Sequence, residues 1–180
     1  MNTGLLLRNI GRWLLLLALQ IVVLDNVYLG GYANLVIYVL FILMLPTGMN
    51  KNLLLLLAFG SGLLVDVFNN MLGFHAVACT AVAFMRAVFA DRMLTKDEPV
   101  VIDTPSIFSV GNQQYVGYLT LMLGVYNLLY FSFVVFDFGD LWRILLLSVL
   151  STLADIVLVL LYQFVFLRGN ERPNTKSSLS

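Results

Sequence analysis

Long apolar stretches separated by short polar connections constrain this chain more than any other feature. Six such stretches occur, over residues 10–24, 32–45, 52–68, 74–89, 115–136 and 141–167. A helix needs about 20 mostly apolar residues to cross a bilayer. Only 11% of the 180 residues are charged, against about 25% in soluble domains. The sequence therefore predicts an all-α integral membrane protein, a bundle of six transmembrane helices.

The domain organisation expected from these stretches is simple. Residues 1–168 form one transmembrane domain, and residues 169–180 form a disordered polar tail on the cytoplasmic side. The first stretch has no small-x-small cleavage site after it, so we expect an uncleaved membrane helix and not a signal peptide. Residues 90–114 are the one long loop. It is either a solvated linker or a segment that lies on the membrane surface or on a partner.

Basic residues are distributed unevenly between the two expected sides of the membrane. Arg143 is the one basic residue on the second side. The other nine fall on the first side, namely Arg8, Arg12, Lys51, Arg86, Arg92, Lys96, Arg168, Arg172 and Lys176. The positive-inside rule makes the first side cytoplasmic and places both termini there. The formal net charge is zero, which argues against nucleic-acid binding.

Several polar residues are expected inside the bilayer, where they should face protein and not lipid. Gln20 lies in the middle of the first stretch and should point into the bundle. Asp155 lies near the middle of the last stretch, and Asn127 lies at a similar depth in the stretch before it. The short connection near residues 137–141 makes these two helices antiparallel neighbours, so we expect Asn127 and Asp155 to be in contact.

The Asn127–Asp155 pair has two interpretations. It is either a proton or ligand site, or a hydrogen bond that locks two helices with Asp155 in its neutral form. Small residues at Gly117, Thr120 and Gly124 recur with helical spacing on the helix that carries Asn127. Such residues allow helices to approach closely, and we expect this face to pack against the helix that carries Asp155.

A polar turn joins two apolar stretches within residues 59–86. It is built from Asn69, Asn70 and Gly73, which are turn-forming residue types. Asp66 precedes the turn and His75 follows it. A carboxylate at a helix C-terminus is unfavourable without a partner, and the candidates are His75 and Arg143. We expect these residues to shape a helical hairpin at the outer membrane face.

Gly62 lies one turn before Asp66 on a small-residue face, which we expect to be a docking surface for a partner helix. Arg86 lies about three turns below His75, and its side chain is expected to extend to the lipid headgroups.

The hairpin sequence GLLVDVFNNMLGFHAVA resembles that of the rod shape-determining protein MreD, in the form found in Bacteroidetes-like Gram-negative bacteria. Gly62, Asp66, Gly73 and His75 stand at family-like positions. The resemblance implies a fold like that of the S-components of energy-coupling-factor transporters. It also implies a non-enzymatic subunit of the bacterial elongation complex in the inner membrane, acting in rod shape determination and lateral-wall peptidoglycan synthesis.

The partner implied by the resemblance is MreC, a single-span membrane protein. Through MreC, a protein of this kind is connected to the MreB filament, to RodA and to a class B transpeptidase. The resemblance implies no cofactor and no metal. The rival within binding proteins is a vitamin-binding S-component, which would need a ligand-sized cavity near the outer face.

An enzymatic rival would use Asp66 or Asp155 in an intramembrane transferase or hydrolase. The two carboxylates are expected at different depths, and neither has a second carboxylate or a Cys/His set beside it in the sequence. His75 has no second histidine nearby, and the one cysteine, Cys79, lies in an apolar stretch. We therefore expect no catalytic or metal site.

Overall fold

A computed structural model describes residues 3–27, 34–94, 102, 104–135 and 140–166. Within these residues the protein is all-helical, as the sequence predicts. The long helices are α1 (Thr3–Val22), α3 (Lys51–Asn69), α4 (Phe74–Leu94), α6 (Asn112–Val135) and α7 (Leu141–Phe166). The short ones are η1 (Leu24–Asn26), α2 (Val39–Leu43) and α5 (Ile107–Val110).

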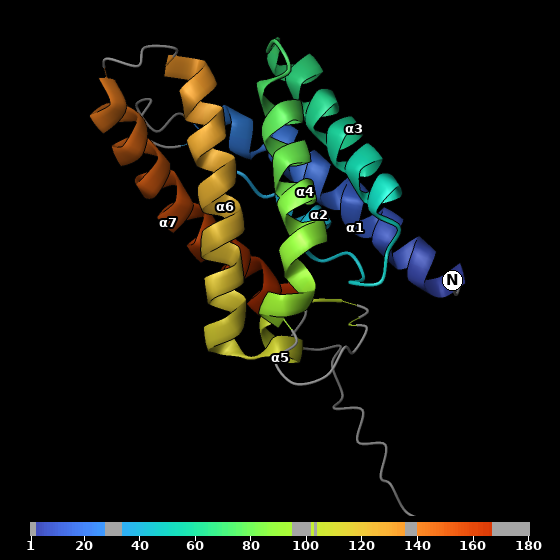
Figure 1. The fold of residues 1–180 in the computed structure, drawn as a ribbon. Helices are drawn as coiled ribbons and strands as arrows, with labels where there is room; N and C mark the ends of the chain where they lie inside the picture. The colour runs from blue at the N-terminus through green and yellow to red at the C-terminus, as the bar shows by residue number, and fades with distance from the viewer. Residues whose placement is uncertain (1–2, 28–33, 95–101, 103, 136–139, 167–180) are drawn as a thin grey trace, which may run out of the picture.

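The long helices pack in a chain of neighbours, with α3 against α4, α4 against α6, and α6 against α7 (Figure 1). α1 contacts α2 and α3. The start of α1, the start of α3 and the end of α7 lie at one end of the bundle, and the α3–α4 turn lies at the opposite end (Figure 1). We call the end with the α3–α4 turn the hairpin end.

Among the described residues, four helices are long and apolar enough to cross a membrane, and α4 contributes a shorter apolar stretch, Phe74–Phe89. The four are Arg8–Asn26, α3, α6 and α7. The outward faces of these helices carry large apolar side chains, such as Leu56, Val149 and Val157, each more than half exposed. This is the surface expected of a bundle whose solvent is lipid.

The predicted helix over residues 32–45 is wrong. Residues 34–37 have no regular secondary structure, and α2 has only five residues. All of residues 36–45 are nevertheless at most 5% exposed. Their high hydropathy reflects burial inside the protein, and the β-branched Val36 and Ile37 suit an extended backbone. We call residues 34–46 the central segment, because it runs through the middle of the bundle.

The predicted loop, residues 90–114, is shorter in the structure than expected. α4 continues to Leu94, and α5 and the first turn of α6 lie within the predicted range. Ser106 begins α5 with a capping box, in which its hydroxyl accepts from the Ser109 N–H. Ile102 pairs with Thr47, donating its N–H to the threonine hydroxyl at 3.0 Å. This part of the loop thus packs on the protein itself. The predicted tail, residues 169–180, lies outside the described residues.

Candidate functional site

The backbone of the central segment needs hydrogen-bond partners from the rest of the bundle. A backbone that is not helical leaves its N–H and C=O groups without partners along the chain, and each unpaired group costs several kcal/mol in a membrane interior. Such a backbone is tolerated only where surrounding protein supplies the missing partners. Polar side chains at both ends of the central segment supply them here.

Side-chain oxygens accept hydrogen bonds at the first end of the central segment. The Asn34 N–H donates to Ser151 Oγ at 2.9 Å, and the Val36 N–H donates to Asp155 Oδ1 at 2.8 Å. The Ile37 N–H donates to Gln20 Oε1 at 2.9 Å. Side chains of α1 and α7, which lie far apart in sequence, therefore accept hydrogen bonds from three backbone N–H groups of the central segment.

The Gln20 amide also satisfies a carbonyl. Its Nε2 donates to Leu35 O at 2.9 Å and to Asp25 Oδ1 at 2.6 Å. Gln20 is fully buried, as its predicted position inside the bundle requires. One side chain of α1 thus binds the central segment through both ends of its amide.

Side-chain donors meet the carbonyls at the other end of the central segment. The Arg86 guanidinium donates to Leu45 O and, at 3.4 Å, to Pro46 O. The Tyr118 hydroxyl donates to Leu43 O at 3.4 Å. Arg86 is only 3% exposed, so the prediction that it extends to the headgroups is wrong. Its charge instead faces the carbonyl end of α2, where a cation is favourable.

Asn127 and Asp155 are in contact, as their positions in the sequence predict. Asn127 Nδ2 donates to Asp155 Oδ2 at 2.8 Å and to Thr152 Oγ1 at 3.2 Å. Both Asn127 and Asp155 are fully buried. Asp155 therefore bonds α6 with one oxygen and the central segment with the other. This second bond could not be predicted from the sequence, because it depends on a backbone that is not helical.

Asp66 lies at the hairpin end and caps the helix that follows it. Its Oδ1 accepts the His75 N–H at 3.1 Å, and its Oδ2 accepts the Ala76 N–H at 2.8 Å. These are first-turn N–H groups of α4, where the helix dipole favours a negative charge. Of the two predicted partners of Asp66, His75 is confirmed, through its backbone N–H and not through its ring, and Arg143 is wrong. Arg143 is exposed at the start of α7, and the His75 ring bonds elsewhere.

Gly62 permits the contact between α3 and α4 that brings Asp66 to this position. A Cβ at Gly62 would lie 2.5 Å from Ala76 Cα and 2.6 Å from His75 O. Both are backbone atoms that cannot move aside without shifting α4. The predicted docking role for the Gly62 face is therefore wrong, because the protein's own hairpin occupies it.

The turn of the hairpin uses the predicted residues. Asn70 adopts the left-handed conformation with φ 53°, and its N–H caps α3 by donating to Asp66 O. Gly73 has φ 93°, which a residue with a Cβ adopts only with strain. Asn69 Nδ2 donates to Asp25 Oδ2 at 2.8 Å, which ties the hairpin to the end of α1.

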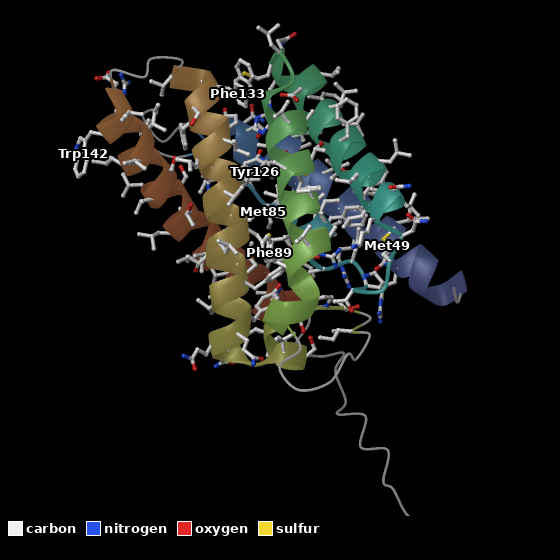
Figure 2. All side chains as sticks on the ribbon, viewed as in Figure 1. Met49, Met85, Phe89, Tyr126, Phe133 and Trp142 are labelled. Carbon is white, nitrogen blue, oxygen red and sulfur yellow. The ribbon has the colours of Figure 1, made fainter. Side chains whose placement is uncertain are left out.

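The His75 side chain points into the bundle and begins a chain of phenols. Its Nδ1 lies 2.5 Å from the Tyr126 hydroxyl, which lies 3.0 Å from the Tyr38 hydroxyl. Figure 2 shows Tyr126 between α6 and α4. The ring of Tyr130 lies 4.6 Å from that of His75. We did not predict these tyrosines from the sequence; the available signal was their spacing of four residues on α6, which places Tyr126 and Tyr130 on one face.

Gly117 and Gly124 do not pack closely against α7, contrary to the prediction, although Gly124 borders α7. An added Cβ at Gly117 or Gly124 would meet no atom within 4 Å. Both glycines line an outward groove on α6 together with Thr120 and Leu128. Thr120, Gly124 and Leu128 also border a groove whose other wall is α7, where Ser148, Val149 and Thr152 contribute. We call this surface the α6–α7 groove.

Many buried polar side chains bond to the protein's own backbone, and others bond to one another. No group of three or more His, Cys, Asp or Glu side chains that could hold a metal ion occurs in the part of the chain that the structure describes. Asp66 and Asp155 each accept two hydrogen bonds from the protein itself. Comparison with protein-family models, curated proteins and solved structures finds no match to this chain.

Proposed function

We propose that this protein is a membrane scaffold that binds the transmembrane helix of a single-span partner in the α6–α7 groove. The observation that carries the proposal is the placement of Gly124 in this groove and of Gly117 in the adjoining groove on α6. Glycine in a helix costs about 1 kcal/mol relative to alanine, and nothing inside this bundle requires it at either position. A helix that approaches from outside would use the space that the missing side chains leave.

The resemblance of the hairpin to MreD suggests which scaffold this is. We propose a non-enzymatic subunit of the bacterial elongation complex in the inner membrane, with both termini in the cytoplasm and an MreC-like protein as the partner. Through this partner the protein would be connected to MreB, RodA and a class B transpeptidase. The filled interior of the bundle supports a scaffold over a vitamin-binding S-component, because the central segment occupies the space between the helices.

The test is co-purification of the MreC-like protein of the same organism, co-expressed with this chain and extracted in mild detergent. Gly124→Leu fills the α6–α7 groove, and we expect recovery of the partner to fall about tenfold, a loss of about 1.4 kcal/mol of binding free energy. Gly60→Leu is the matched control. Gly60 also has no atom within 4 Å of an added Cβ, but it lies on α3.

Equal recovery of the partner with Gly124→Leu and Gly60→Leu would overturn the α6–α7 groove as the docking site. Recovery of no MreC-like protein even with the unsubstituted chain would overturn the scaffold role for this partner. A bound molecule of a few hundred daltons in native mass spectrometry, with no bound protein, would favour the transporter component.

A further inference from the structure

The two buried carboxylates of this protein differ in what stabilises a negative charge on them. Asp66 accepts two backbone N–H groups at the N-terminus of α4, where the helix dipole is positive. Asp155 accepts one backbone N–H and one side-chain amide, and neither belongs to the first turn of a long helix. The described residues form no ion pair with Asp155. A negative charge is therefore much less well compensated at Asp155 than at Asp66.

Burial makes this difference matter. Asp155 is fully buried halfway along a helix of 26 residues that is apolar enough to cross a membrane. An isolated carboxylate in such surroundings is costly, and a proton removes that cost.

Asn127 provides a second, independent observation at the same place. Its Oδ1 is buried and has no hydrogen-bond partner, while its Nδ2 donates to Asp155 Oδ2. A side-chain amide carries a donor at one end and an acceptor at the other, and a half-turn about its last bond exchanges them. The observed orientation suits an ionised Asp155. The opposite orientation suits a neutral Asp155, whose O–H would then donate to Asn127 Oδ1.

We propose that Asp155 is a proton-binding site in the centre of the bundle and that the Asn127 amide turns over when the proton binds. The proton is taken up from solvent and bonds to Asp155 Oδ2, which then donates to Asn127 Oδ1. The Val36 N–H keeps its bond to Asp155 Oδ1, so the central segment remains in place. The proposal does not depend on the scaffold role.

The surroundings of Asp155 contain few competing titratable groups. The phenol of Tyr126 lies within its electrostatic reach on α6. Tyr126 bonds in turn to Tyr38 of the central segment and to His75 of α4. α1 contributes Gln20, which is neutral, and α7 contributes the hydroxyls of Ser151 and Thr152 near Asp155. No described lysine or arginine forms an ion pair there.

Turning of the Asn127 amide has a consequence at the protein surface. In the observed state Thr152 Oγ1 accepts from Asn127 and donates to Ser148 O. A turned amide presents its oxygen to this hydroxyl, whose single proton must leave Ser148 O if it is to be donated to Asn127 Oδ1. Thr152 and Ser148 both line the α6–α7 groove. Proton binding in the interior therefore changes the hydrogen bonding in the wall of that groove.

The experiment is infrared difference spectroscopy of the full chain in lipid nanodiscs between about pH 9 and pH 6. Ordinary carboxyl groups, with pKa values near about 4, stay ionised over this range. We expect acidification to produce a carboxylic-acid C=O band that Asp155→Asn removes completely. Asp66→Asn is the matched control and should keep the band. Asn127→Ala should shift the frequency of the band, because it removes the group that accepts from the acid.

Several results would overturn the proposal. One is a band that persists in Asp155→Asn, and another is the absence of any pH-dependent band from the unsubstituted chain. If Asp155→Asn does not fold, the Asn127→Ala spectrum decides the matter, since an unchanged band frequency would place the titrating acid elsewhere. A band of constant intensity from pH 9 to pH 6 would mean that Asp155 does not exchange its proton, and would equally overturn the proposal.

Discussion

Gly62 shows how much of this fold depends on a single missing side chain. The position lies on α3 directly against the backbone of Ala76 on α4, and this contact places the Asp66 carboxylate on the first-turn N–H groups of α4. A methyl group at this position would clash with backbone atoms, which cannot move without shifting the helix. The helix cap at the hairpin end therefore depends on the absence of a side chain at Gly62.

We expect Gly62→Ala to destabilise the protein by about 1–3 kcal/mol, the usual cost of overpacking a close contact. The measurement is the thermal unfolding midpoint in detergent, followed by circular dichroism. Gly60→Ala, on the same helix with open space around it, is expected to leave the midpoint unchanged or raise it slightly. A midpoint for Gly62→Ala equal to that of the unsubstituted protein would mean that α4 moves away at little cost.

At the scale of elements, the central segment is held by side chains and not by its own secondary structure. Gln20 alone satisfies both the Ile37 N–H and the Leu35 carbonyl. Removing the amide leaves the buried Ile37 N–H and the part-buried Leu35 carbonyl without this partner, and a buried unpaired group costs about 1–3 kcal/mol. The free energy of local opening in the extended part of the segment should therefore depend on these side-chain hydrogen bonds.

Hydrogen exchange tests this directly. In the unsubstituted protein, the amides of Val36 and Ile37 should exchange as slowly as those of the long helices, although residues 34–37 are not helical. Gln20→Leu should speed exchange at Ile37 by at least about tenfold, which corresponds to about 1.4 kcal/mol of lost protection. Gln113→Leu, the same substitution at an exposed position of α6, is the control and should leave exchange at Ile37 unchanged.

The same segment marks the limit of what the sequence predicts. Apolar length correctly predicted helices over the described parts of the stretches 52–68, 115–136 and 141–167, which form α3, α6 and α7. Hydropathy cannot separate a helix in lipid from an irregular segment buried in protein, since both are apolar. The contact between Asn127 and Asp155 was predicted correctly, because both residues were expected at a similar depth on neighbouring helices. The second partner of Asp155, the Val36 N–H, depended on the unpredicted backbone.

The whole molecule has two ends of different character. Trp142, 77% exposed at the start of α7, points away from the bundle near the hairpin end, as Figure 2 shows. Leu72 of the α3–α4 turn is 89% exposed at the same end. The other end holds the starts of α1 and α3. The first half of α1 carries Arg8 and Arg12, and Lys51 is the first residue of α3. The distribution of basic residues predicts that the end opposite the hairpin end faces the cytoplasm.

This orientation is measurable with a membrane-impermeant thiol reagent on intact spheroplasts. Cys79, which is buried, is first replaced by Ala. We expect Leu72→Cys to be labelled in intact spheroplasts, and Ser177→Cys to be labelled only after the membrane is opened. The reverse pattern would show that the chain is inserted the other way round. Labelling of both positions in intact spheroplasts would place the α3–α4 turn and the C-terminal tail on the same side of the membrane.

The dispersed origin of the contacts around the central segment has a consequence for biosynthesis. Its N–H groups bond to Gln20 of α1 and to Ser151 and Asp155 of α7, and its last carbonyls bond to Arg86 of α4. Residues 34–46 leave the ribosome more than a hundred residues before Ser151 and Asp155 are made. Until α7 is inserted, this stretch has no complete set of partners and cannot rest stably in lipid. We therefore expect this stretch to remain with the insertion machinery or at the membrane–water boundary until the last helix is inserted.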